Sequence, residues 1–217
     1  MDIGLLPLLR SDPMAFLLLA VALIGSLGLH EYAHALAADL QGDRLPRAMG
    51  RLTPNPIKHL DPLGTILIFL AGFGWGKPVE FRPSALSSKR FGAAIVALAG
   101  PLTNLLLALV GAFALGIVGR AGGDELVLGG NPVAVFLRFF VSINIVLAVF
   151  NLVPLPPLDG SRLLTIFLPP NKQRIIFFLD KYGFLILLAL VFFGGFALLS
   201  PVIEAVGGWV LDVAGVI

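Results

Sequence analysis

The chain has 217 residues, of which 58% are hydrophobic and only 13% are charged, and its mean hydropathy is +0.97. A water-soluble domain needs more charge than this to cover its surface, so the composition predicts a membrane protein. The net charge of +2 is small, and the basic residues lie between apolar runs rather than in one patch, which argues against nucleic acid as a partner. Because the chain has no cysteine, disulfides, thiolate metal sites and cysteine nucleophiles are excluded.

Apolar stretches long enough to cross a bilayer, which takes about 20 helical residues, divide the chain. They cover residues 14–40, 91–118, 132–153 and 175–199. A shorter apolar stretch at 62–75 lies between two basic loops, so we expect it to enter the membrane and return to the same side. Residues 201–217 read as an amphipathic or partly inserted tail. The sequence thus predicts an all-α polytopic membrane protein with about four full transmembrane helices and a re-entrant segment, and it leaves a short β-hairpin open at 43–60.

The distribution of basic residues predicts the topology. Loops 41–60, 77–90 and 160–174 are basic and are expected in the cytoplasm, whereas loop 120–130 is not basic and is expected outside. The apolar run near the N-terminus lacks a preceding basic region and a following cleavage site, so we expect it to be a permanent span. With no block of soluble composition, residues 1–217 are expected to form a single membrane-embedded domain.

A candidate metal motif, His30-Glu31-Tyr32-Ala33-His34, lies in the first predicted span. Each helical residue turns about 100°, so His30 and His34 lie about 40° apart and present their imidazoles on one face, as zinc requires. Glu31 follows the first histidine directly and can act as a base toward a metal-bound water. The alternative is a set of structural hydrogen bonds within a helix bundle, but such polar groups at membrane depth are expensive without a function.

A zinc hydrolase site normally has three protein ligands, so the motif needs a third. Asp39 is on the same helix but lies about 180° from His30 and faces away from it. Asp159 is the best candidate, because it follows the proline-broken end of the third span, at the cytoplasmic face that His34 also approaches.

The two motifs together resemble a known family. HEYAH in one membrane helix and NLVPLPPLDG at the end of another resemble the site-2 protease family of intramembrane zinc metalloproteases. Residues 51–64 and 99–104 are similar to the small bacterial and archaeal subgroup that consists of little more than a catalytic core, here about residues 14–165. The sequence shows no PDZ or CBS module of the kind that many relatives carry.

The resemblance implies one zinc ion held by His30, His34 and Asp159, with Glu31 as the catalytic base and Asn151 as a polar partner. It implies an endopeptidase that cuts within or next to transmembrane segments of its substrates. The expected protein is a multi-pass component of a prokaryotic cell membrane, with its active site near the cytoplasmic face. Its partners are a transmembrane protein substrate and the lipid bilayer, and its oligomeric state stays open.

Two further sets of residues are expected to handle substrate. The oxyanion needs a hydrogen-bond donor besides the metal, for which Asn151 is the first choice and Asn104 the second; both could instead bond between helices. A substrate helix must unwind before cleavage, and an enzyme edge strand would stabilise the extended form. The alternating segment after the Gly-rich turn at 72–76 predicts this strand, with Val79 and Phe81 in contact with substrate, although an interfacial loop with an aromatic anchor fits equally.

A membrane metal-ion transporter that uses the same His and Asp residues is the main rival. Such a transporter would not need Glu31 beside its first histidine or ligands confined to one helix face. Haem is a weaker rival, because two histidines at i and i+4 cannot ligate opposite faces of one haem. A catalytically silent scaffold is disfavoured by the intact Glu31.

Overall fold

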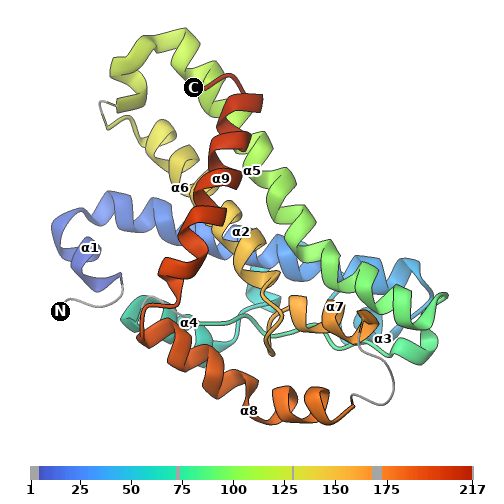
Figure 1. Cartoon of the computed structure of the whole chain (residues 1–217). Helices are drawn as coiled ribbons and strands as arrows, with labels where there is room; N and C mark the ends of the chain where they lie inside the picture. Colours follow the sequence, from blue (N-terminus) through green and yellow to red (C-terminus); the bar gives the residue numbers. More distant parts are fainter. Residues whose placement is uncertain (1–4, 72–73, 129, 168–172, 217) are drawn as a thin grey trace.

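The computed structural model describes residues 5–71, 74–128, 130–167 and 173–216. The described part is built from helices (Figure 1). In chain order they are α1 (Leu6–Ser11), α2 (Pro13–Leu40), α3 (Leu45–Ala48), η1 (Pro56–Lys58), α4 (Pro62–Ala71), η2 (Pro83–Ala85), α5 (Lys89–Leu128), α6 (Pro132–Asn151), α7 (Gly160–Phe167), α8 (Gln173–Phe192) and α9 (Phe196–Val213).

Helices α2, α5 and α6 pack against one another and form the centre of the protein. Each contains a stretch long and apolar enough to cross a membrane. Capping residues mark the N-termini of α2 and α6. The side chain of Asp12 accepts a hydrogen bond from Ala15 N–H ahead of α2, and Asn131 caps α6 in the same way. Proline stands at the first turn of both helices, where its missing N–H costs nothing. The chain is an all-α polytopic membrane protein, as predicted.

The predicted boundaries agree with the structure for α2 and α6 but not for the other spans. Helix α5 continues to Leu128, through most of the segment expected to be the external loop. The span expected at 175–199 is broken: α8 ends at Phe192, and the chain turns by 81° before α9. Gly194, with φ of +86°, lies in this turn and adopts a left-handed conformation that favours glycine.

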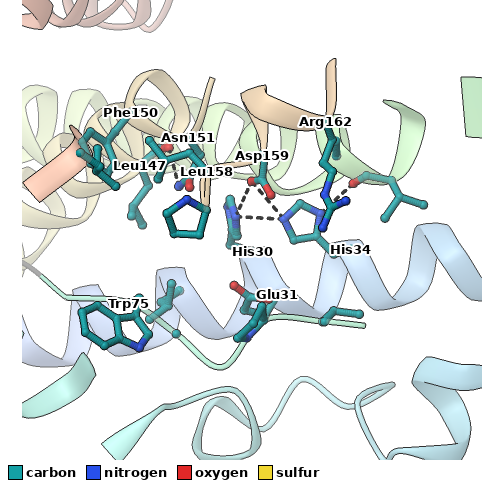
Figure 2. Close-up of a pocket in the computed structure, with 18 of the residues that line it drawn as sticks. His30, Glu31, His34, Trp75, Leu147, Phe150, Asn151, Leu158, Asp159 and Arg162 are labelled. Atoms are coloured by element: carbon teal, nitrogen blue, oxygen red, sulfur yellow. Dashed lines mark hydrogen bonds and ion pairs between the residues drawn. The ribbon is translucent and has the colours of Figure 1, made fainter. Parts of the chain in front are cut away.

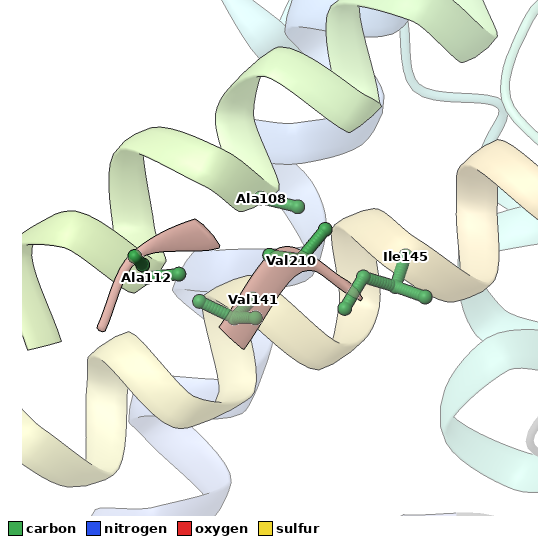
Figure 3. Close-up of a cluster of buried hydrophobic side chains, with 6 residues drawn as sticks. Ala108, Ala112, Val141, Ile145 and Val210 are labelled. Carbon is green, nitrogen blue, oxygen red and sulfur yellow. The ribbon is translucent and has the colours of Figure 1, made fainter. Parts of the chain in front are cut away.

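Helix α9 is part of the packed bundle. A hydrophobic cluster joins it to α5 and α6 (Figure 3). Val210 of α9 is fully buried between the small side chains of α5 and the branched side chains of α6. The buried members of the cluster are Ala108, Ala112, Val141, Ile145, Val210 and Ala214. The structure adds to the expectation of an amphipathic or partly inserted tail at 201–217 that this segment packs against the bundle, because small residues on α5 let α9 approach closely.

The chain segments on either side of α4 lie next to each other. With ten residues, α4 is too short to cross hydrocarbon. Leu60 just before α4 pairs with Gly76 just after it, and the N–H of Lys77 donates to the carbonyl of His59 at 2.7 Å. Among the described residues this pairing is a single bridge, and loop 43–60 folds into α3 and η1. The hairpin left open for that loop is absent there, since Pro46, Pro54 and Pro56 interrupt any ladder.

Asp43 ties the end of α2 to the returning segment. Its carboxylate is fully buried and accepts hydrogen bonds from the N–H groups of Leu45 and Arg82 and from the Arg82 guanidinium. Burial alone would raise the pKa of the Asp43 carboxyl, but these hydrogen bonds and the Arg82 charge outweigh it and hold the pKa below its usual value. The junction is therefore strongest when Asp43 is ionised.

We expect Asp43→Asn to lower the thermal unfolding temperature in detergent at pH 7 by roughly 3–6 °C. The amide nitrogen cannot accept from Arg82 N–H. Because the folded-state pKa is depressed, the stabilisation is present above the unfolded pKa of about 3.9 and is lost as pH falls through the folded value. The difference between variant and wild type should thus shrink at pH 3. Glu80→Gln, the same charge change at an exposed site, is the control, and an equal loss in both variants would contradict the prediction.

Candidate metal centre

Two histidines of α2 and one aspartate from the chain after α6 converge on a common point (Figure 2). The Nε2 atoms of His30 and His34 are 3.0 Å apart. The Oδ2 atom of Asp159 lies 3.1 Å from the first and 3.2 Å from the second. All three candidate ligand atoms lie within 4.8 Å of one another, so residues 129 positions apart in the chain can bind one ion.

The second ring nitrogen of each histidine faces an oxygen of α5. His34 Nδ1 lies 2.7 Å from the main-chain carbonyl of Val96, and His30 Nδ1 lies 2.5 Å from Asn104 Oδ1. A carbonyl can only accept, so His34 Nδ1 carries the hydrogen and its Nε2 keeps a free lone pair. Histidines that bind metals are held in this manner by outer hydrogen bonds. Two imidazole nitrogens and a carboxylate, with room for a water, form a donor set that fits zinc.

The close approach of α5 to the imidazoles depends on a glycine. A Cβ atom at Gly100 would collide with His34 Nε2 and lie 2.5 Å from His30 Cε1. The next residue, Pro101, lies inside α5 and has no N–H, so the carbonyl of Ala97 lacks its usual helical donor. Gly100 thus gives α5 the space for the two imidazole rings.

The third candidate ligand is placed by a folded loop. Pro154, Pro156 and Pro157 prevent α6 from continuing, and successive turns bring the chain back on itself. A Cβ at Gly160 would lie 2.5 Å from the carbonyl oxygen of Val153, so this position requires glycine. The fold-back places Asp159, which is half-buried, at the start of α7 and opposite the histidines.

A cavity of about 220 Å³ opens beside the candidate ligands. Glu31 lines it from α2, is 9% exposed, and makes no hydrogen bond to any other residue that the structure describes. Asn151 lines it from α6, and Val79 and Phe81 line it from the segment that returns after α4. The cavity thus brings together a free carboxylate, an amide and an extended segment beside the candidate metal ligands.

By contrast, Asp39 lies away from His30, as expected. Its carboxylate forms ion pairs with Arg47 at 2.7 Å and with Arg44 at 3.1 Å.

The two asparagines considered as oxyanion donors occupy different places. Asn151 is in the cavity, where its Nδ2 donates to the Leu147 carbonyl at 3.0 Å. Asn104 lies behind His30, is fully buried, and donates through Nδ2 to Asn144 at 2.7 Å. Since both polar atoms of Asn104 are engaged away from the cavity, the structure gives it a position unlike that expected of an oxyanion donor.

Sequence reasoning did not select Arg162 as a site residue. Arg162 lines the same cavity from the first turn of α7 (Figure 2). The signal was its spacing, because a residue three positions after Asp159 in a helix lies on nearly the same face. The sequence alone had suggested only a topological role for this basic residue.

We expect Gly100→Ala to lower zinc affinity by more than tenfold, because the added methyl group occupies the space of both imidazoles. Competition with a chromophoric chelator measures the affinity. Gly25→Ala, at a helical glycine of α2 with no atom within 4 Å of an added Cβ, should bind zinc as the wild type does. Wild-type affinity in Gly100→Ala would show that the imidazoles do not need this space.

Comparison with known proteins identifies the family. Residues 18–133 and 116–194 match peptidase family M50. The chain is 41% identical over 172 residues to YwhC of Bacillus subtilis, described as a candidate zinc metalloprotease, and the match covers 79% of this chain and 78% of YwhC. It is 34% identical over 185 residues to the Rip2 protein of Mycolicibacterium smegmatis, which carries the same description, with 81% and 67% covered.

A third match, to the Rip2 protein of Mycobacterium tuberculosis strain H37Rv, has 30% identity over 215 residues and covers 93% of this chain and 75% of that protein. No solved structure matches the chain. The resemblance inferred from the two motifs is thus confirmed over most of the sequence. The chain belongs to peptidase family M50, the site-2 protease family of membrane zinc metalloproteases.

Proposed function

We propose that His30, His34 and Asp159 hold one catalytic zinc ion and that the protein hydrolyses peptide bonds within or next to transmembrane segments of its substrates. The observation that carries this proposal is the convergence of three ligand atoms within 4.8 Å at a cavity that also contains Glu31. Membership of the M50 family supports the reaction class. The chemistry of the donor set supports zinc rather than a hard cation, which prefers sites made of oxygen atoms.

A bound zinc ion supplies Lewis acidity, which polarises a carbonyl and lowers the pKa of water to about 7. The Glu31 carboxylate then accepts the proton of the attacking water and delivers it to the leaving amine nitrogen. Its lack of a partner among the described residues leaves its oxygens available for this transfer. Asn151 Nδ2–H donates to the oxygen that becomes negative as water attacks the peptide carbonyl. One of the two Nδ2 hydrogens of Asn151 donates to the Leu147 carbonyl, which leaves the other for this role.

The extended segment at 78–82 is proposed to hold the unwound substrate. Among the described residues, no hydrogen bond reaches the backbone N–H or C=O groups of Val79, Glu80 or Phe81. Such an edge offers a template for β-augmentation, in which main-chain hydrogen bonds replace those that the substrate helix loses. The side chains of Val79 and Phe81 face the cavity, so an added strand would run past the candidate ligands.

Two further proposals concern the side of the membrane on which the site lies and the extent of the domain. Several basic residues follow His34 in the chain. Arg44 and Arg47 form ion pairs with Asp39, and Arg82 forms an ion pair with Asp43. We propose that this end is cytoplasmic and that cleavage takes place near that face. Because α9 packs against α5 and α6, residues beyond the core at 14–165 are proposed to belong to the same single domain over 1–217.

Glu31→Gln should retain about one zinc ion per chain while cleavage of a model transmembrane peptide falls by a factor of 10² to 10⁴, because the amide cannot accept the proton from water. Metal analysis and gel-based cleavage of the reconstituted protein measure the two quantities. Glu204→Gln, at an exposed glutamate of α9, is the matched control and should keep wild-type cleavage. Undiminished cleavage in Glu31→Gln would refute the proposed base, whereas zinc transport into vesicles without cleavage would favour a transporter.

Val79→Pro should reduce cleavage more than tenfold with zinc still bound, because proline removes a backbone N–H from the proposed edge. Val79→Ala keeps the backbone and only shortens the side chain, so its loss should be smaller. Glu80→Ala serves as the control for substitution within this exposed segment. Equal turnover in Val79→Pro and wild type would contradict the β-augmentation proposal.

A further inference from the structure

Buried polar side chains from three helices form a continuous chain behind His30. Asn104 of α5, Asn144 of α6 and Ser26 of α2 are all fully buried. Asn104 joins His30 at 2.5 Å and Asn144 at 2.7 Å. Asn144 Nδ2 lies 2.7 Å from the main-chain carbonyl of Phe140 and 2.8 Å from Ser26 Oγ. The chain thus connects a backbone carbonyl of α6 to the ring of a candidate zinc ligand.

The direction of every hydrogen bond in this chain follows from its far end. The Phe140 carbonyl can only accept, so Asn144 turns its NH₂ group toward it and its Oδ1 toward Asn104. Asn104 must then donate through Nδ2 and turn its own Oδ1 toward His30. His30 Nδ1 consequently carries the hydrogen, and its Nε2 lone pair points to His34 and Asp159.

We propose that Asn104 and Asn144 are positioning residues that fix the tautomer and ring orientation of His30, so that Nε2 is the metal ligand. This inference rests on the proposed function in one respect, namely that His30 binds zinc. Neither asparagine lines the cavity, so they act through His30 and not on the substrate. Asn144 exerts its effect from a second helix and through Asn104.

The two histidines therefore depend on different kinds of support. His34 is oriented by the backbone carbonyl of Val96, which no side-chain substitution removes. His30 is oriented by two asparagine side chains 40 residues apart, and each amide group must keep its oxygen and its NH₂ group on the same sides. The ligand role of His30 is thus the one that point substitutions outside the cavity can disturb.

Substitutions at Asn104 separate positioning from simple packing. Asn104→Leu keeps the branched shape of the side chain, with a larger volume, but removes the acceptor for His30 Nδ1–H. Asn104→Asp, as a buried neutral acid, reproduces both bonds, with its O–H donating to Asn144 and its other oxygen accepting from His30. Positioning predicts that zinc affinity falls ten- to hundredfold in Asn104→Leu and stays within about threefold of wild type in Asn104→Asp. A packing role predicts the reverse order, since a buried acid is then harmful and leucine harmless.

The experiment uses the full-length protein purified in detergent. Chelator competition gives the zinc affinity, and the visible absorption of the Co²⁺-loaded protein reports the ligand geometry. Asn144→Leu should show an intermediate loss of affinity, because Asn104 loses the acceptor that orients it. Ile145→Val, a packing change at the neighbouring buried residue of α6, is the control and should bind metal as wild type does.

A second measurement, on wild type and Asn144→Leu, tests the proposal even if the variants at position 104 fold poorly. The chain has only three histidines, so ¹⁵N-histidine NMR resolves the His30 ring nitrogens. A single Nδ1–H form of His30 in wild type and a mixture of both forms in Asn144→Leu would support the proposal. Wild-type zinc affinity in Asn104→Leu, or one unchanged tautomer in Asn144→Leu, would overturn it. If wild type and His30→Ala bind zinc equally, the proposed function itself fails, an outcome distinct from the first two.

Discussion

The imidazoles of His30 and His34 lie against the backbone of α5, and the rest of the site depends on this contact. It requires glycine at position 100, because any Cβ there would overlap the rings. It also brings the Val96 carbonyl and the Asn104 amide to the outer ring nitrogens. Inside a membrane no water satisfies such groups, so each buried polar atom needs a protein partner. The packing of α2 on α5 therefore decides both the place and the chemical state of the candidate ligands.

The remaining parts of the site come from elements with less regular structure. Asp159 reaches the histidines through a proline-rich loop that ends α6 and folds back at Gly160. Val79 and Phe81 reach the cavity from an extended segment that is held at one end, where Gly76 pairs with Leu60. Rigid helices thus carry two candidate ligands, while the third candidate ligand and the proposed substrate edge belong to loops. This division suits a protease that must keep its metal fixed and still admit an unwound substrate.

Prediction from the sequence succeeded where hydropathy and motif spacing act locally, as in α2, α6 and the placement of His30 and His34 on one helix face. It failed where the outcome depends on neighbouring helices. The 175–199 stretch is apolar throughout, and hydropathy does not register the bend of 81° between α8 and α9. The packing of the tail at 201–217 was not predicted, because its burial comes from contact with Ala108 and Ala112 of a distant helix. Spacing also does not tell on which side of His30 Asn104 lies.

The sequence by itself determined the membrane class, the candidate zinc motif on α2, the third candidate ligand and the family, because these follow from composition, helical periodicity and short motifs. Only the tertiary structure decided which oxygen faces each outer ring nitrogen, the direction of the amide chain from Phe140 to His30, and the place of Arg162 at the cavity. The hydrogen bonds among those features join residues up to 74 positions apart. They exist only once three helices pack closely enough for their polar side chains to satisfy one another.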